Sequence, residues 1–349
     1  MKFPKKNSYL FLSVIFLLMA GCDSSTSRNN KLSIKGDQIY MDGKAFDMWG
    51  IRVASATEDQ FAADHLIAQL DDYKKYGVNS VAVYFMGSRG GSYDQFSADG
   101  KSIDTDHCER MEKIISTCND RGMAVITGIF YQRIDSGKIH IRDWDAAKNA
   151  VRSTASWLNS LPYKNIILNI ANEQNSTAYN VVPWKKVREP ESIKELCHIA
   201  KETAPELIVG AGGYDIEKNK LIGTSGAIDI LLFDTSKPEE NSEFHYNIYK
   251  AAGVKVPMVN VEMFGGWTKK FVDGVFSNEP DIKYYYNEAD AVARIDGLYT
   301  FFFASDWSQS RSSGKANRYD LAGTGSPEDP GIRWFFEYVA KLKGIKVQP

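Results

Sequence analysis

Cysteine and histidine are scarce in this chain of 349 residues, which contains four cysteines and five histidines. One cysteine, Cys22, follows an N-terminal apolar stretch, and the others are Cys108, Cys118 and Cys197. Cys108 and Cys118 fall within one predicted helix, where ten residues separate them by about 15 Å, too far for a disulfide. The histidines show no spacing typical of a metal site. We therefore expect cysteines that pack as small core or helix-face residues, and no bound metal.

Several motifs are also missing, and each absence argues against a class of chemistry. The sequence has no G-x-S-x-G nucleophile turn and no histidine at a predicted strand end, so an esterase is unsupported. It has no P-loop, so phosphate chemistry is equally unsupported. The 42 basic and 44 acidic residues do not provide the basic excess of a nucleic-acid-binding protein. We expect no nucleic-acid partner and no cofactor.

No membrane span is predicted at the N-terminus, because the apolar stretch at residues 10–20 is shorter than the roughly 20 residues that a span needs. Lys2, Lys5 and Lys6 precede the stretch, as is typical of a signal peptide. The stretch runs into Leu-Met-Ala-Gly-Cys, which resembles the bacterial lipoprotein cleavage box. The resemblance implies that Cys22 becomes the lipid-modified first residue. An ordinary signal peptide with an incidental cysteine is the alternative.

These features divide the chain into three expected segments. Residues 1–21 form a lipoprotein signal peptide, residues 22–32 a polar flexible tether, and residues 33–349 a single folded domain. Cleavage before Cys22 leaves 39 basic and 44 acidic residues, a net charge of -5. We expect a monomer in the bacterial cell envelope, held to the lipid bilayer at the outer membrane, the periplasmic face or the cell surface.

The folded segment alternates apolar strands with amphipathic helices, which predicts a parallel sheet with helices outside it. The order and length suit an α/β fold of the (β/α)8 TIM barrel type. Residues 32–46 alternate in polarity around two Gly/Asp turns and predict a short N-terminal β-hairpin cap. The predicted barrel strands are 46–53, 78–86, 123–131, 165–171, 207–211, 228–233, 256–261 and 297–304. The predicted helices include 57–76, 105–121, 144–161, 189–203, 284–295 and 331–342.

Two of the predicted strands deliver a glutamate at the carboxyl end. The run NIILNIANE ends at Glu173, and VPMVNVE ends at Glu262, 89 positions later. All strand ends of this kind open onto one face of a parallel barrel, so the two carboxyl groups can meet there. The longest insertions, after strands 2, 4 and 8, lie on the same face. Most enzymes that cleave glycosidic bonds use a facing pair of carboxyl groups.

At these residues the sequence resembles the clan A glycoside hydrolases, and most closely the cellulase-like family 5. Asn172 and Glu173 match the family's Asn-Glu pair, which implies that Glu173 is the acid/base and that Asn172 binds the sugar's 2-hydroxyl. Glu262 matches the nucleophile of strand 7. Trp307 stands where the family places a tryptophan under the reacting sugar. A solvated loop glutamate and a rim aromatic are the ordinary alternatives for these positions.

Other positions depart from the family pattern. The family's arginine within strand 2 is absent, and Arg52, leaving strand 1, is expected to replace it. The histidine after strand 3 is also absent, which leaves Tyr131 or Gln132 to contact the sugar, with Tyr84 as a weaker candidate. The His-x-Tyr of strand 6 is missing. His245 and the adjacent tyrosine fall on a predicted helix, unless residues 243–249 form strand 6 instead.

We therefore expect a glycosidase that acts on a β-linked poly- or oligosaccharide. Two carboxyl groups about 5 to 5.5 Å apart would give retention through a covalent intermediate, and about 6.5 to 9.5 Å would give inversion. The sequence does not contain that distance, and retention with Glu262 as nucleophile follows from the resemblance. The alternative is a glycan-binding lipoprotein on a degenerate hydrolase barrel, which the missing family residues suggest and the presence of both glutamates opposes.

Overall fold

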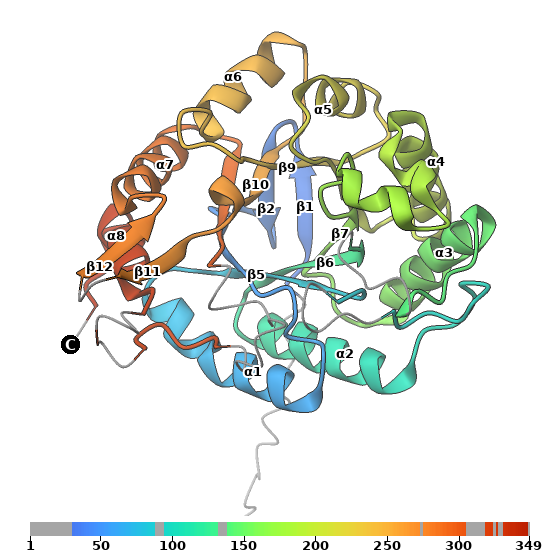
Figure 1. Cartoon of the computed structure of the whole chain (residues 1–349), viewed down its shortest axis with the longest axis horizontal. Helices are drawn as coiled ribbons and strands as arrows, with labels where there is room; N and C mark the ends of the chain where they lie inside the picture. The colour runs from blue at the N-terminus through green and yellow to red at the C-terminus, as the bar shows by residue number, and fades with distance from the viewer. Residues whose placement is uncertain are drawn as a thin grey trace, which may run out of the picture.

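The computed structural model describes residues 30–87, 94–131, 138–272, 275–304, 318–323, 326 and 331–347, and for residues 268–279 only the backbone. Within this part of the chain, eight parallel strands close into a barrel (Figure 1). In order around the barrel they are β4 (Trp49–Arg52), β5 (Ser80–Tyr84), β6 (Ala124–Phe130), β7 (Ile166–Ala171), β8 (Ile208–Ala211), β9 (Ile230–Asp234), β10 (Met258–Glu262) and β13 (Leu298–Phe302). The predicted (β/α)8 fold is confirmed. Strands β9 and β10 each extend one residue past their predicted ends, to a carboxylate side chain.

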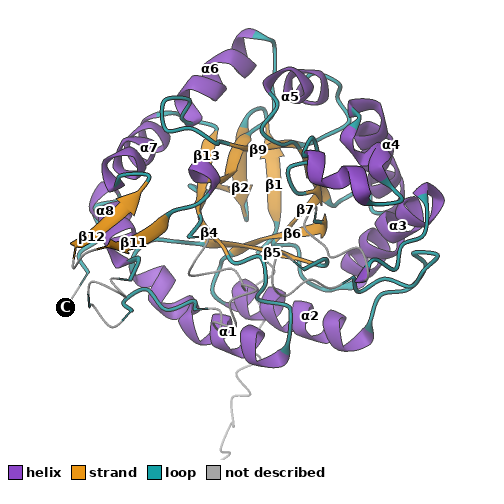
Figure 2. Cartoon of the chain, in the orientation of Figure 1, coloured by secondary structure: helices purple, strands orange, loops and turns teal. Residues whose placement is uncertain are grey.

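Helices surround the barrel and connect consecutive strands, as Figure 2 shows. They are α1 (Gln60–Lys75), α2 (Thr105–Asp120), α3 (Trp144–Ser160), α4 (Pro190–Thr203), α5 (Ile216–Gly223), α6 (Ser242–Ala251), α7 (Ile282–Arg294) and α8 (Arg333–Leu342). Helix α1 begins at Gln60, three residues later than predicted, because Asp59 caps it by accepting a hydrogen bond from the Ala62 amide. The short helix α5 was not among the predicted helices, although Asp215 provides the same kind of cap.

A small antiparallel sheet closes the amino end of the barrel. It consists of β1 (Leu32–Lys35), β2 (Gln38–Met41) and β3 (Lys44–Ala45), and its first strand begins one residue before the predicted domain boundary. The Ile39 amide donates to the Tyr299 hydroxyl at 3.1 Å, and the Leu32 amide donates to a backbone carbonyl just before β7. Ile39 and Leu32 are buried against side chains inside the barrel. The predicted hairpin cap is thus confirmed, with a third short strand.

Close packing inside the barrel also positions two tyrosine side chains at its carboxyl end. Gly128 of β6 lies under the ring of Tyr84, and a Cβ atom at that position would stand 2.1 Å from the ring carbon. Only glycine therefore leaves room for the Tyr84 ring to cross toward β6 and reach Tyr131, with which it makes an edge-to-face contact at 5.2 Å between centroids. Tyr84 and Tyr131 are both buried at the carboxyl ends of their strands.

The loop after β10 contains an unpredicted hairpin. Strands β11 (Thr268–Val272) and β12 (Val275–Glu279) pair antiparallel and lie beside α8 in Figure 1. The Asp-Gly dipeptide of the sequence at positions 273 and 274 is a hairpin signal that could have predicted it. None of the described helices is both long and apolar enough to cross a membrane.

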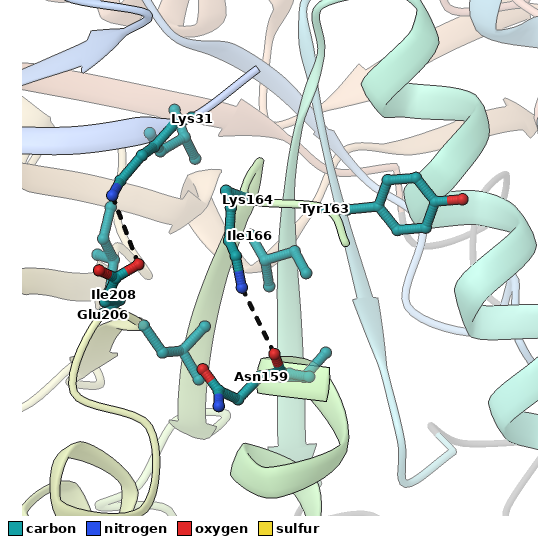
Figure 3. A pocket seen from close by; sticks show the side chains of 10 residues that line it. Lys31, Asn159, Tyr163, Lys164, Ile166, Glu206 and Ile208 are labelled. Atoms are coloured by element: carbon teal, nitrogen blue, oxygen red, sulfur yellow. Dashed lines mark hydrogen bonds and ion pairs between the residues drawn. The ribbon is translucent and has the colours of Figure 1, made fainter. Parts of the chain in front are cut away.

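A small cavity lies where the barrel strands begin (Figure 3). Glu173 and Glu262 lie at the other ends of the strands. It holds about 20 Å³, room for roughly one water molecule. Its lining comes from the starts of β7 and β8, the end of α3 and the residues around β1. The exposed ion pair between Lys31 and Glu206, at 3.4 Å, lies at its edge. This cavity is too small to hold a sugar.

Candidate active site

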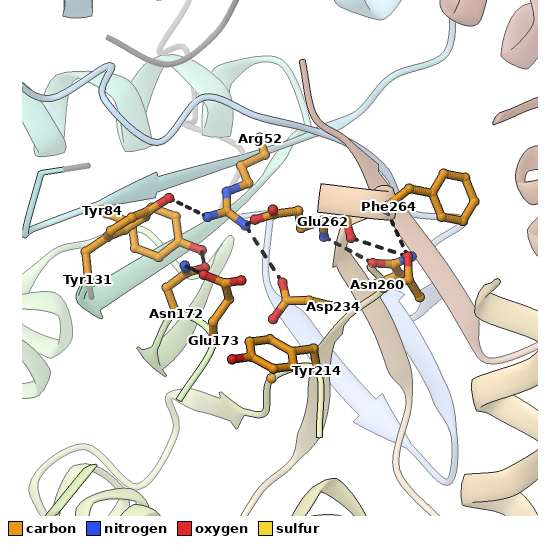
Figure 4. A network of polar contacts seen from close by, with 12 residues as sticks. Arg52, Tyr84, Tyr131, Asn172, Glu173, Tyr214, Asp234, Asn260, Glu262 and Phe264 are labelled. Atoms are coloured by element: carbon orange, nitrogen blue, oxygen red, sulfur yellow. Dashed lines mark hydrogen bonds and ion pairs between the residues drawn. The ribbon is translucent and has the colours of Figure 1, made fainter. Parts of the chain in front are cut away.

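Arg52 is the centre of the polar cluster at the carboxyl end of the barrel (Figure 4). It is the last residue of β4, and its guanidinium is fully buried. Nη1 forms an ion pair with the Glu262 carboxylate, and Nη2 donates to the Tyr131 hydroxyl at 2.7 Å. The cation also lies 4.9 to 5.6 Å from the ring centroids of Phe303, Tyr84 and Tyr131. Arg52 therefore lies beside Glu262, and its contact with a sugar stays a prediction.

Glu262 ends strand β10 and is almost completely buried, with 8% of its surface exposed. Its backbone amide donates to Asn260 Oδ1 at 3.1 Å, and its carbonyl accepts from the Thr235 amide at 3.1 Å. The pairing between β9 and β10 shifts register between Asn260 and Glu262. This irregularity re-aims the side chain at the strand end, and the carboxylate meets Arg52 there.

Glu173 and Asn172 follow the last residue of β7. Glu173 has a φ of +41°, a left-handed conformation that costs a non-glycine residue on the order of 1 to 3 kcal/mol. Asn172 Nδ2 donates to Glu173 at 3.5 Å, and its Oδ1 accepts from the Tyr84 hydroxyl at 3.2 Å. The Tyr179 hydroxyl donates to the Asn172 carbonyl at 2.8 Å and fixes this turn from behind.

Asp234 is a third carboxyl group in the cluster and is not among the predicted site residues. It ends strand β9, is 3% exposed, and has its Oδ1 3.8 Å from Arg52 Nη1. Burial raises the pKa of Asp234 well above its usual range; the charges of Glu262 and Glu173 raise it further, and Arg52 lowers it. Its position at a barrel strand end, one residue past the predicted strand, was the available signal.

The electrostatics show that the two predicted glutamates act on the same groups. Burial is the largest cause that raises the pKa of Tyr131 to about 12, Arg52 opposes it, and the charges of both Glu262 and Glu173 add to the rise. The same two charges act on Asp234. Figure 4 shows Glu173 and Glu262 on either side of Asp234 and Arg52. Strand ends far apart in the sequence therefore meet in one site.

A second buried network supports Glu262 from behind. Glu288 of α7 accepts hydrogen bonds from the Ser242 amide at 2.9 Å, from the Ser242 hydroxyl, from Asn260 Nδ2 at 3.0 Å and from the Thr300 hydroxyl at 3.4 Å. Asn260 in turn accepts the Glu262 amide. Glu288 is fully buried, and burial raises its pKa although these hydrogen bonds lower it. The network links helix α7 to the backbone at Glu262.

Other predicted residues lie elsewhere or outside the description. Cys22 and Trp307 lie outside the described residues, as does Gln132. His245 and Tyr246 are on helix α6, so the alternative of a strand at 243–249 is wrong. His245 Nδ1 lies 3.1 Å from the Tyr249 hydroxyl, and the Tyr246 hydroxyl donates to the Asp296 carbonyl at 3.2 Å. Burial lowers the pKa of His245 to about 4. Both side chains stabilise the packing of α6.

Other aromatic residues in or after the barrel strands divide by exposure. Trp49, Trp184 and Trp267 are buried core residues, and Trp184 packs on Tyr179 and Phe130. Tyr214, after β8, is 38% exposed and stands beside Asp234 and Glu173 in Figure 4. Within the described part of the chain, no group of three or more histidine, cysteine, aspartate or glutamate residues is arranged to hold a metal ion.

Several solved structures with a similar fold are glycoside hydrolases. An endo-1,4-β-mannanase from Rhizomucor miehei is 16% identical, with a TM-score of 0.57 over 78% of this chain and 90% of that one. A glycoside hydrolase family 5 protein from Bacteroides vulgatus is 15% identical, with a TM-score of 0.61 over 88% of this chain and 70% of that one. A β-glucanase from Saccharophagus degradans, solved with cellotetraose, is 14% identical, with a TM-score of 0.59 over 90% and 94%.

These likenesses confirm, at the level of the fold, the resemblance to clan A and family 5 that the sequence predicts. No protein-family model matches the chain. No curated protein sequence matches it either. The low identities leave the activity to be argued from the residues of the site.

Proposed function

We propose that the protein is a retaining glycoside hydrolase that cleaves β-linked poly- or oligosaccharides, with Glu173 as the acid/base and Glu262 as the nucleophile. One observation carries the proposal: Glu173, just after β7, and Glu262, which ends β10, lie around the same buried Asp234, Tyr131 and Arg52. A carboxyl pair at the carboxyl end of a barrel is what acetal cleavage needs.

The contacts of the two glutamates fit different roles. Glu262 forms an ion pair with buried Arg52, which requires the carboxylate form that attacks an anomeric carbon. Glu173 contacts the neutral amide of Asn172, which accommodates a proton on the carboxyl group. In the first step Glu262 bonds to the anomeric carbon while Glu173 gives its proton to the leaving oxygen. In the second step Glu173 takes a proton from water, which displaces Glu262 from the sugar.

The missing strand-2 arginine does not leave the site without a guanidinium, because Arg52 reaches Glu262 from β4. This weakens one motive for the alternative, a glycan-binding lipoprotein without turnover. Tyr214 and Tyr84 offer aromatic or hydroxyl contacts to a sugar at the same end of the barrel. The solved mannanase and β-glucanase with this fold make β-mannans and β-glucans the first substrates to test.

The test uses reducing-sugar release from a panel of β-mannans and β-glucans by wild type, Glu173→Gln and Glu262→Gln. Both variants should lose hydrolysis and keep glycan binding. Glu206→Gln is the matched control, because Glu206 is exposed at the opposite end of the barrel. Proton NMR of the first product then gives the anomer, and an inverted product would refute retention. Equal binding without hydrolysis by wild type and both variants would establish the binding protein instead.

We also propose that the protein is lipid-anchored in the bacterial cell envelope through Cys22. The support is the Leu-Met-Ala-Gly-Cys run after an apolar stretch preceded by lysines. Wild type expressed in a bacterial host should partition with membranes and incorporate labelled fatty acid. Cys22→Ser should be found in the aqueous fraction without label, and Cys108→Ser should behave as wild type. Label on the Cys22→Ser variant would refute the anchor.

A further inference from the structure

The feature that the two-glutamate mechanism does not use is Asp234. Its carboxyl group is nine-tenths or more buried, and no described residue gives either oxygen a hydrogen bond. Arg52 forms a long ion pair with Asp234, with 3.8 Å between Nη1 and Oδ1, and donates its hydrogen bond from Nη1 to Glu262. Figure 4 shows Asp234 between Arg52 on one side and Glu173 and Tyr214 on the other. A buried carboxyl group that accepts no hydrogen bond in this place requires an explanation.

The ion pair with Arg52 does not by itself account for the buried Asp234 carboxyl group, because it is long and shared with Glu262. Asp234 and Glu262 share one guanidinium, and Glu262 makes the closer contact with it. A buried carboxylate without a hydrogen-bond donor is strongly disfavoured relative to its protonated form. The direction of the Asp234 pKa, raised by burial first and then by Glu262 and Glu173, agrees with this. The titratable groups that interact electrostatically with Asp234 are Arg52, Glu173, Glu262, Tyr84, Tyr179 and Tyr249.

We propose that Asp234 is a substrate-binding residue that carries a proton in the resting protein and hydrogen-bonds the hydroxyl groups of a neutral sugar beside Glu262. The assignment of a sugar rests on the proposed function, whereas the protonation does not.

A protonated carboxyl group has one O–H donor and a carbonyl acceptor, the same pair that a sugar hydroxyl offers. The two groups can therefore satisfy each other without placing another charge in the site. An amino sugar would need Asp234 to be ionised, since its ammonium group pairs with a carboxylate. The uncharged form thus selects for a neutral ring, and it leaves the Arg52 cation to Glu262.

The protonation is tested without substrate, by infrared spectroscopy at neutral pH. Wild type should show a protonated-carboxyl band that Asp234→Asn removes. Asp94→Asn is the matched control: Asp94 is also buried, but its carboxylate accepts the backbone amides of Phe96, His140 and Ile141, and it lies apart from the site. This control should leave the Asp234-dependent band in place. A spectrum in which Asp234→Asn removes no such band would overturn the proposal.

The sugar contact is tested with Asp234→Asn and Asp234→Leu. Asparagine keeps a donor and an acceptor, so kcat/KM on the best neutral glycan should fall by less than about tenfold. Leucine offers neither, and the loss should reach about a hundredfold, because such bonds strengthen in the transition state. Equal losses in both variants, or a preference of wild type for amino-sugar glycans, would overturn the proposal.

The two hypotheses fail in distinguishable ways. If wild type hydrolyses no glycan, the proposed function fails, while the infrared band still decides whether Asp234 is protonated. Calorimetric binding of a neutral oligosaccharide by wild type, Asp234→Asn and Asp234→Leu then decides the sugar contact, because affinity kept with asparagine and reduced with leucine supports it, and equal affinity in all three refutes it. If Asp234→Leu does not fold, as judged by circular dichroism, the asparagine variant and the infrared band carry the test.

Discussion

The ends of strands β7 and β10 present the same residue type in two different ways. Glu262 on β10 is held by charge, through buried Arg52, and by a polar network that reaches back to Glu288. Glu173, after β7, is held by backbone conformation and by the neutral Asn172 amide. Each turn contains a non-glycine residue of positive φ, Glu173 itself in one and Phe264, at +53°, in the other.

The difference shows how one barrel face can give two carboxyl groups separate roles. An ion pair favours the charged form of its carboxylate, whereas a neutral amide accommodates either form. The positive φ at both turns indicates that the fold tolerates strain where it directs these side chains. Substitutions that remove the charge, the network or the neutral support should therefore have effects of different sizes.

Removing the charge that holds Glu262 should have the largest effect. Arg52→Met leaves a buried carboxylate without its cation, and we expect the free energy of unfolding to fall by about 3 to 5 kcal/mol. Any glycan hydrolysis should be lost with it, because the nucleophile is no longer oriented. Denaturation with urea, followed by fluorescence, measures the change in stability.

The matched control for Arg52→Met is Arg121→Met, which breaks the ion pair with Asp71 on the protein surface. Exposed pairs contribute about 0 to 1 kcal/mol, so this variant should remain close to wild type. Equal losses of stability in the two variants would mean that Arg52 does not stabilise the site through a buried charge pair.

Replacing the Glu288 carboxyl group, which supports Glu262 through Asn260, should have an intermediate effect on stability that depends on pH. Glu288→Gln keeps the shape but not all four accepted bonds, and we expect a loss of about 1 to 3 kcal/mol at acid pH. Burial raises the pKa of Glu288 in the folded protein, so the folded state binds more protons than the unfolded state above the unfolded pKa. Wild type therefore loses stability relative to the variant as the pH rises from about 4.5 through the folded pKa.

Unfolding curves at several pH values test this prediction, with Glu243→Gln as the control. Glu243 is on helix α6 and forms an ion pair with Arg294 at the surface. Its substitution should change stability by no more than about 1 kcal/mol at any pH. If wild type instead gains stability relative to Glu288→Gln as the pH rises, the pKa of Glu288 is not raised by burial.

The barrel and both glutamate positions were predictable because short local sequence patterns determine them. Apolar strands that end in Asn-Glu or Glu place carboxyl groups on one face whenever the strands are parallel, and this needs no knowledge of distance. Arg52 was also predictable, as a guanidinium leaving strand 1. Its partners were not, because the choice between Glu262 and Asp234 depends on side-chain reach across the barrel.

The supporting residues could not be predicted for a related reason. Asp234 follows an ordinary apolar strand, and Glu288 looks like one more polar residue of an amphipathic helix. Only the three-dimensional packing shows that both are buried. The β11–β12 hairpin was missed because its strands contain charged residues and lie outside the barrel pattern, although its Asp-Gly turn was visible.

Removing the support behind Glu173 should have the smallest effect. Tyr179→Phe loses the hydroxyl that donates to the Asn172 carbonyl at 2.8 Å and to the Phe130 carbonyl at 3.3 Å, inside the core. We expect unfolding to become easier by about 0.5 to 1.5 kcal/mol. If this bond also orients Glu173, hydrolysis should slow through kcat rather than KM, because the acid acts only at the reacting bond.

Tyr246→Phe is the control for this variant, since it also removes a hydroxyl that donates to a backbone carbonyl, that of Asp296, but on helix α6 away from the site. It should cost less stability, because water can replace the bond at a partly exposed position, and it should leave kcat unchanged. A Tyr179→Phe variant with reduced stability but unchanged kcat would show that the hydrogen bond from Tyr179 to Asn172 stabilises the fold and does not orient Glu173. The orientation of the Glu173 turn would then not depend on the Tyr179 hydroxyl.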